Sequence, residues 1–143
     1  VCQAPPWFSF TPNMIGKPAL WSAQGNNDDG GMGAVDIAYG AGYFKLEEGE
    51  GLEMKGKMPE CVFANVVLWN RYLQTLDFAT RQVSLNRKQM HLNDDGEFTI
   101  LVSEYPAPEL GYENWLDTEG RSGGIVFWRF ILPEGGVEQP KTR

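Results

Sequence analysis

Apolar and polar residues alternate along several stretches of the chain, with the two-residue period of half-buried β-strands. In residues 52–58, Leu52 and Met54 share one face while charged residues occupy the other. The same alternation recurs in residues 34–46 and 97–105. These stretches therefore predict strands with one face in a core and the other in water.

Two further stretches are almost continuously apolar and rich in β-branched and aromatic residues, as is typical of strands inside a sheet. They cover residues 61–70 and 125–132, and Pro133 ends the second. Arg129 interrupts one otherwise apolar face of the second stretch, which it shares with Ile125, Phe127 and Ile131. If that face is the inner one, Arg129 needs a buried anionic or carbonyl partner. We expect the protein's own loop at residues 106–124 to supply this partner.

Turn-forming residues separate the predicted strands. The sequence NDDG at 93–96 predicts a hairpin between an extended segment at 83–92 and the strand at 97–105. Residues 71–82 place some apolar side chains at helical spacing, and we expect a short helical turn there at most. Seven or eight short strands with turns between them predict an all-β sandwich or barrel.

The chain of 143 residues fits one domain with an irregular segment at each end. Residues 34–133 form the predicted β-domain. Residues 1–33 are expected to be an irregular N-terminal arm, because their prolines and aromatics follow no period. Residues 134–143 are expected to be a frayed C-terminal tail.

Charge and length exclude two classes of partner. The net charge of −7 argues against nucleic acid, because no positive field would attract phosphates. No apolar run approaches the ~20 residues of a membrane-spanning helix. Cys2 and Cys61 either form a disulfide between arm and domain or remain two free thiols.

Sequence motifs for common enzyme chemistry are missing. His91 is the only histidine, and no serine has the GxSxG surroundings of a hydrolase nucleophile. Neither GxxxxGK[ST] nor GxGxxG is present, so we expect no catalytic residue of these classes and no bound cofactor. The NNDDGG sequence at 26–31 lacks the twelve-position calcium pattern. We favour a solvated loop there, with a structural cation as the alternative.

Tryptophans near amides and arginines are the remaining chemical signal, because such residues stack on and hydrogen-bond polar ligands. The candidate ligand-binding residues are Trp69, Asn86, Asn114, Trp115, Asp117 and Arg129. The alternative, which we favour, is that the aromatics pack and the arginines pair with Asp77, Asp117 or Glu119. Asn114 and Asp117 would then bond the backbone of their own loop.

Three stretches resemble the family called domain of unknown function 1214. They are LEEGEGLEMKGKMPECVFANVVLWNRYLQTLD, RQVSLNRKQMHLNDDGEFTILVSEYPAP and ENWLDTEGRSGGIVFWRFILP, and the match spans about residues 40–133. The resemblance implies a bacterial, jelly-roll-like antiparallel β-sandwich. In many members this domain ends a longer chain that also carries a domain of unknown function 1254. The resemblance implies no settled activity and provides no catalytic residues.

These observations predict a non-catalytic β-sandwich module that binds a small polar ligand or docks on another protein domain of a longer protein or oligomer. An alternative is an enzyme acting on a small polar or carbohydrate-like substrate, with the six candidate residues around one pocket and Asp117 as acid or base. A third alternative is an assembly protein whose free sheet edges or faces join copies into a homo-oligomer.

Overall fold

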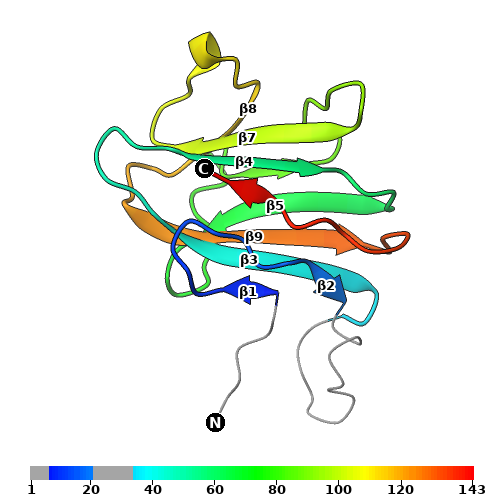
Figure 1. Cartoon of the computed structure of the whole chain (residues 1–143). Helices are drawn as coiled ribbons and strands as arrows, with labels where there is room; N and C mark the ends of the chain where they lie inside the picture. Colours follow the sequence, from blue (N-terminus) through cyan, green and yellow to red (C-terminus); the bar gives the residue numbers. More distant parts are fainter. Residues whose placement is uncertain (1–6, 21–33) are drawn as a thin grey trace.

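Two β-sheets packed face to face form the body of the computed structural model, which describes residues 7–20 and 34–143 (Figure 1). Sheet A has the strand order β1-β3-β9-β5-β6, with β2 also paired to β3, and sheet B has the order β10-β4-β7-β8. The chain is an all-β sandwich, as the strand pattern predicted. The strands are β1 (Phe8–Ser9), β2 (Ala19–Leu20), β3 (Ile37–Lys45), β4 (Leu52–Lys57), β5 (Phe63–Trp69), β6 (Ser84–Asn86), β7 (Glu97–Ser103), β8 (Asn114–Asp117), β9 (Gly123–Ile131) and β10 (Lys141–Thr142).

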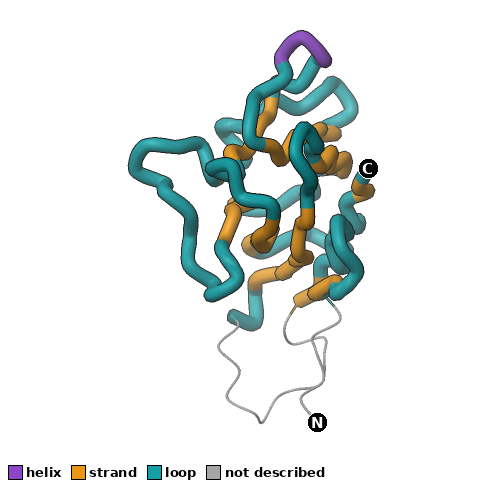
Figure 2. The backbone as a smooth tube through the Cα atoms, turned by 90° about the vertical axis from the view of Figure 1, so that its left-hand side faces the viewer, coloured by secondary structure: helices purple, strands orange, loops and turns teal. Residues whose placement is uncertain are grey.

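Helix is confined to one 3-10 turn, η2 (Pro108–Leu110), within the described ranges. Figure 2 shows this turn on a loop that projects from one end of the sandwich. Residues 71–82, where a short helical turn was expected at most, form turns instead. Asn70 sets the first of these, because its Oδ1 accepts the backbone N–H groups of Tyr72 and Gln74. In the described part of the chain, no helix has the length and apolar character needed to span a membrane.

Strand β9 is the centre of sheet A, because it pairs antiparallel with β3 on one side and β5 on the other. Its continuous apolar sequence agrees with this position, since both of its faces are largely buried. Two pairings depart from an antiparallel sandwich: β1 runs parallel to β3, and β7 runs parallel to β8.

The predicted hairpin at residues 93–96 is wrong, although the turn itself forms. Asn93 Oδ1 accepts the backbone N–H groups of Asp95 and Glu97, as expected of a turn asparagine. The flanking strands, however, belong to different sheets: β6 pairs with β5, and β7 pairs with β4. The turn therefore carries the chain from sheet A to sheet B, because local turn chemistry does not select the pairing partner.

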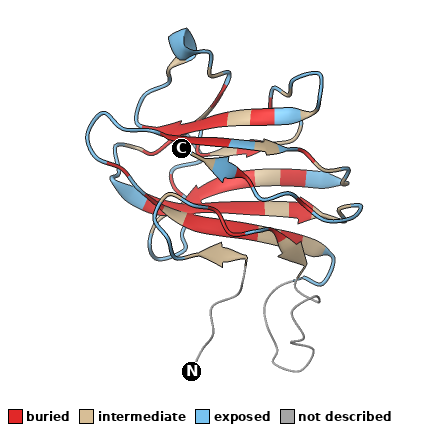
Figure 3. Ribbon diagram, viewed as in Figure 1, coloured by how far each residue is buried: buried red, intermediate tan, exposed pale blue. Residues whose placement is uncertain are grey.

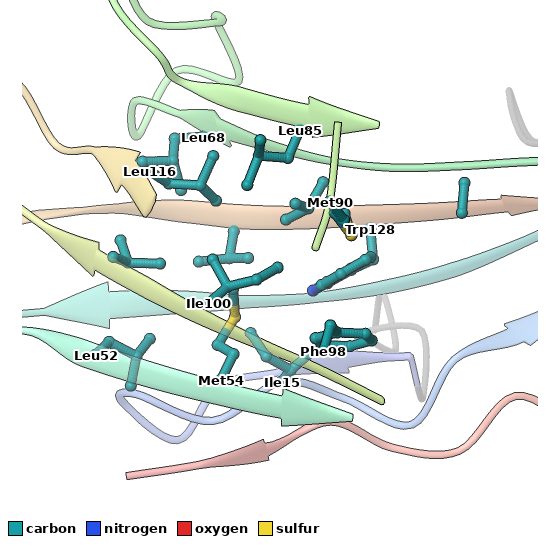
Figure 4. Packing of buried hydrophobic residues seen from close by; sticks show 14 of the residues in the cluster. Ile15, Leu52, Met54, Leu68, Leu85, Met90, Phe98, Ile100, Leu116 and Trp128 are labelled. Atoms are coloured by element: carbon teal, nitrogen blue, oxygen red, sulfur yellow. The ribbon is translucent and has the colours of Figure 1, made fainter. Parts of the chain in front are cut away.

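The core lies between the sheets and is built from the inward-facing residues of their long strands (Figure 3). Trp128 of β9 is fully buried, with its ring centroid 4.9 Å from that of Phe98 and 5.3 Å from that of Phe130. Figure 4 shows Trp128 and Phe98 among the aliphatic side chains of both sheets. The contact between Phe98 of sheet B and Trp128 of sheet A joins the two layers.

The N-terminal arm is more regular than predicted over its described residues. Beyond the short strands β1 and β2, Ile15 is 1% exposed and belongs to the main core. Asn13 is bonded to Lys45 in both directions, because its Nδ2 donates to the Lys45 carbonyl and its Oδ1 accepts the Lys45 N–H. Gly42 leaves room for this arm, since a Cβ there would lie 1.9 Å from the carbonyl oxygen of Met14.

The C-terminal tail does not fray. Its strand β10 pairs with β4 at the edge of sheet B, and Val137 is buried in the main core. Gln139 Nε2 donates to the carbonyl of Ile15 at 2.7 Å, which joins the tail to the arm.

Cys61 is half-buried. Cys2 and the NNDDGG sequence lie outside the described residues, so the predictions on a disulfide and on a cation at residues 26–31 stay predictions.

Candidate functional site

The six candidate ligand-binding residues divide between the two sheets. Trp69, Asn86 and Arg129 belong to β5, β6 and β9 of sheet A, whereas Asn114, Trp115 and Asp117 all belong to β8 of sheet B. The predicted pocket that would gather all six around a substrate is therefore not formed. The division follows from β8, which was expected to be part of a loop but is a strand at the edge of sheet B.

Asn114 is a structural residue, because its buried amide is fully used by the protein's own backbone. Its Oδ1 accepts the His91 N–H at 2.8 Å. Its Nδ2 donates to the carbonyl oxygens of His91 at 2.9 Å and Thr99 at 3.0 Å. The side chain thereby ties β8 to the segment that connects the sheets, and both N–H donors of its amide are occupied.

Asp117 and Trp115 are likewise bonded within the protein. Asp117 Oδ2 accepts from Arg81 Nη1 at 2.9 Å, and its Oδ1 accepts the Glu119 N–H at 2.7 Å. Trp115 Nε1 donates to the carbonyl and hydroxyl oxygens of Ser103. These contacts match the interpretation that we favoured, in which arginines and carboxylates of this region pair with each other.

The other three candidates lie on the side of sheet A that faces away from the core, which we call the outer face. Side chains on this face form rows across β3, β9 and β5, because the register places them opposite one another. One row is apolar, the next is polar, and the third is apolar again. The first, apolar row consists of Ile37, Ile131 and Phe63. The polar row consists of Tyr39, Arg129, Asn65 and, on β6, Asn86. The third row, again apolar, consists of Ala41, Phe127 and Val67.

An aromatic cluster covers one end of the outer face. Trp69 stacks on Phe127, with ring centroids 4.2 Å apart. Tyr39 lies 5.7 Å from the same ring, and Trp7 lies edge-on at 6.1 Å. The cluster forms a small second core on Ala41 and Val67. Trp69 is therefore a packing residue of this second core.

Arg129 does not have the loop partner that we expected, so that prediction is wrong. Its side chain lies on the outer face of sheet A, and the loop carboxylates Asp117 and Glu119 pair with Arg81 and Arg121 instead. Among residues 7–20 and 34–143, the side chain of Arg129 has no hydrogen-bond or ion-pair partner. Its guanidinium carbon lies 5.9 Å from the Phe127 ring centroid, a cation–π contact.

Two buried polar atoms in the polar row lack hydrogen-bond partners. They are Arg129 Nε and Asn65 Oδ1, which belong to register partners on β9 and β5. A buried donor and a buried acceptor left unpaired each cost free energy, which marks this point of the outer face as unusual. Asn86 differs, because its Oδ1 accepts the N–H groups of Lys88 and Gln89 and stabilises the turn after β6.

A separate hollow of about 790 Å³ lies between loops at one end of the sandwich, and the sequence reasoning missed it. Acidic residues dominate its charged lining, with Arg121 as the basic member; the acidic residues are Glu47, Glu48, Glu50 and Glu104. None of the six candidate residues lines it. Nowhere in the described ranges do three histidine, cysteine or acidic side chains gather as metal ligands would.

Beside the hollow, on sheet B, Glu53 is 8% exposed and interacts with three polar side chains. The Tyr112 hydroxyl donates to Glu53 Oε2 at 2.6 Å, and Lys55 and Arg143 lie at salt-bridge distance. The bond from Tyr112, followed by the two cations, lowers the pKa of Glu53 against the opposing effect of burial. The same bond raises the pKa of Tyr112.

No protein-family model matches the chain, and no curated protein sequence matches it. Two solved structures share its fold. An uncharacterized protein from Burkholderia cenocepacia has a TM-score of 0.78 and 30% sequence identity, over 93% of this chain and 35% of that one. The VPA0106 protein from Vibrio parahaemolyticus has a TM-score of 0.59 and 14% identity, over 86% of this chain and 34% of that one. The chain thus spans about a third of the length of either protein.

Proposed function

We propose that this chain is a non-catalytic interaction module that docks through the outer face of sheet A onto another region of a longer polypeptide. The observation that carries the proposal is the apolar character of that face. A sheet that faces water on one side carries polar side chains there. On β3, β9 and β5 the outward positions are instead mainly aliphatic or aromatic, as expected of a sheet covered on both sides.

Exposure at one end of the outer face supports the proposal. Phe63 is 40% exposed in the apolar row that it forms with Ile131 and Ile37. Next to this row, Val62 is 73% exposed and Leu132 is 52% exposed. Contiguous exposed apolar residues of this kind mark interaction sites more often than isolated ones do.

The lengths of the similar solved structures support a docking partner within the same polypeptide. About two thirds of each of those proteins lies outside the part that this chain matches.

We also propose that the chain belongs to the domain of unknown function 1214 family and has its jelly-roll-like topology. The placement of β9 between β3 and β5 supports that topology, because strands distant in sequence are neighbours in the sheet.

A second copy of the chain is a poorer partner for this face. In a two-fold symmetric dimer each surface meets itself, so Arg129 would face the same patch of the other copy. The described outward residues of β3, β9, β5 and β6 include no aspartate or glutamate in that patch. Such a dimer would therefore bring two arginines together with no carboxylate between them.

A site-specific photo-crosslinker in place of Phe63 tests the proposal in the native protein, within the cells that produce it. The matched control replaces Lys57, which is exposed on sheet B away from the outer face. We expect position 63 to cross-link to one site in the same polypeptide, outside residues 1–143, and position 57 to give no such product. Cross-links only to a second copy or to a different protein, or none above the Lys57 control, would overturn the proposal.

A further inference from the structure

We propose that the region docked on the outer face presents a carboxylate side chain to Arg129, at the centre of an otherwise apolar contact. This inference rests on the proposed function and adds the chemistry of the partner. It starts from one fact: Arg129 Nε is buried and has no hydrogen-bond partner in the described part of the chain. Because this Nε is already desolvated in the free module, a carboxylate that bonds to it gains more than it would at a fully solvated arginine.

The surroundings of Arg129 select the kind of partner. Along β9 the arginine lies between the side chains of Phe127 and Ile131, and across the sheet it faces Tyr39 and Asn65. No described acidic residue on this face competes for it. An apolar surface that carries one acidic side chain is complementary to such a pattern, because the apolar rows exclude water and thereby strengthen the central ion pair.

Asn65 adds a second requirement to the partner. Its Oδ1 is buried and unpartnered, and Asn65 is opposite Arg129 in the register of β5 and β9. The two side chains do not bond to each other in the structure, so one donor and one acceptor both remain without a hydrogen-bond partner. Because neither atom is accessible to solvent, the two side chains must turn toward the docked segment, whose carboxylate then accepts from Arg129 Nε while a nearby N–H group donates to Asn65 Oδ1.

A binding experiment on the chain itself tests this recognition. The probe is phenylacetate, which combines a carboxylate with an apolar ring, and its neutral counterpart is phenylacetamide. We expect phenylacetate to shift the NMR signal of the Arg129 Nε–H group, and phenylacetamide to leave it unchanged at the same concentration. Loss of one charge-assisted hydrogen bond corresponds to roughly a tenfold loss of affinity, so Arg129→Gln should weaken phenylacetate binding by about that factor.

The matched control is Arg121→Gln. Arg121 is half-exposed and pairs with Glu119 on a distant loop, so this variant should bind phenylacetate as the unaltered chain does. Circular dichroism of each variant checks that the fold is intact. Equal binding of phenylacetate and phenylacetamide, or equal binding by Arg129→Gln and the unaltered chain, would overturn the inference.

The two proposals fail separately. If phenylacetate binds at Arg129 but the crosslinker at position 63 gives no product within the polypeptide, docking is wrong and carboxylate recognition stands. If the cross-link forms but phenylacetate shows no preference over phenylacetamide, docking stands and the carboxylate partner is wrong. In the native protein, Arg129→Gln should also lower the yield of the position 63 cross-link, whereas Arg121→Gln should not.

Discussion

Asn114 and His91 are joined by two hydrogen bonds that run in opposite directions, although only the backbone of His91 takes part. Asn114→Ala removes both bonds and a third to the Thr99 carbonyl, and it leaves backbone groups unpaired at the edge of sheet B. We expect the free energy of unfolding to fall by roughly 3 kcal/mol, measured by urea denaturation. His91→Ala is the matched control, because the imidazole is 65% exposed and its removal keeps all three bonds. A cost for His91→Ala as large as that for Asn114→Ala would contradict this account.

The ion pair of Asp117 and Arg81 is asymmetric, and its two members should differ in their importance. The Asp117 side chain is 7% exposed and also accepts the Glu119 N–H, whereas the Arg81 side chain is 48% exposed. Asp117→Ala should cost about 2 to 3 kcal/mol, because it leaves a backbone donor unpaired and opens a void. Arg81→Ala should cost about 1 kcal/mol or less, since water reaches the position it vacates. Thermal or urea unfolding of the two variants gives the comparison, and equal costs would argue against the asymmetry.

Stability in acid should depend on the bond between Tyr112 and Glu53. Because the pKa of Glu53 is lower in the folded protein than its ordinary value of 4.5, the folded state binds fewer protons there than the unfolded chain. The resulting stabilisation is present above the ordinary value and is lost as the pH falls through the folded-state pKa. Tyr112→Phe removes the largest cause of the shift and should cost about 1 kcal/mol at neutral pH.

The measurement is the free energy of unfolding of both proteins between neutral and acidic pH. The difference between the unaltered chain and Tyr112→Phe should shrink as the pH falls below about 4.5. Tyr72→Phe is the control, because Tyr72 is 66% exposed and its hydroxyl bonds Arg71 instead of a carboxylate. A difference that stays constant with pH would show that the Tyr112 bond does not act through the Glu53 carboxylate.

Arg129→Met should stabilise the isolated chain while it weakens phenylacetate binding. The substitution replaces a buried donor that lacks a partner in the described residues by an apolar side chain of similar length. Removing such a group commonly gains about 1 kcal/mol, and the neighbours Phe127 and Ile131 provide apolar contacts for the methionine. Urea denaturation and the phenylacetate titration should therefore change in opposite senses. A loss of stability would indicate that Arg129 serves the fold of the module.

The arm should detach in a variant that fills the space beside β3. In Gly42→Ala, the added Cβ would collide with the backbone carbonyl of Met14, so the arm must move away from β3. We expect faster hydrogen exchange at Gly16, whose N–H donates to the Ala41 carbonyl, and at Asn13, whose N–H donates to the Tyr43 carbonyl. Gly49→Ala controls for the loss of a glycine, since its Cβ would meet no neighbouring atom in its exposed turn. Gly49→Ala should lower the free energy of unfolding slightly, because φ at this position is 81°, but it should leave hydrogen exchange in the arm unchanged.

The long strands could be predicted because each carries its own signal. Alternation in residues 52–57 and the continuous apolar run in 125–131 follow directly from burial on one face or on both. Strand β8 could not be found in this way, because Asn114 and Asp117 are polar residues that become buried only through partners distant in the sequence. Strands β6 and β7 join different sheets because each pairs with a strand distant in the sequence, and the residues of the turn between them do not determine that pairing.

The candidate site was predicted only in part. Trp69, Asn86 and Arg129, three of the residues expected to line one pocket, do share one face of sheet A. The grouping with β8 was wrong, because sequence proximity to tryptophans does not report which sheet a strand joins. The importance of Asn65 was missed, since a single asparagine inside an apolar strand becomes informative only when its register partner is Arg129.

The position of β9 between β3 and β5 has a consequence for how the protein is made. The ribosome releases β3 and β5 well before Gly123–Ile131 has been synthesised, so while the chain grows β3 has only the short strands β1 and β2 beside it, and β5 has only β6. Sheet A therefore assembles only after synthesis has passed its last long strand, which makes folding dependent on contacts distant in sequence. Any fragment that stops short of β9 would display two open strand edges and would be prone to aggregation.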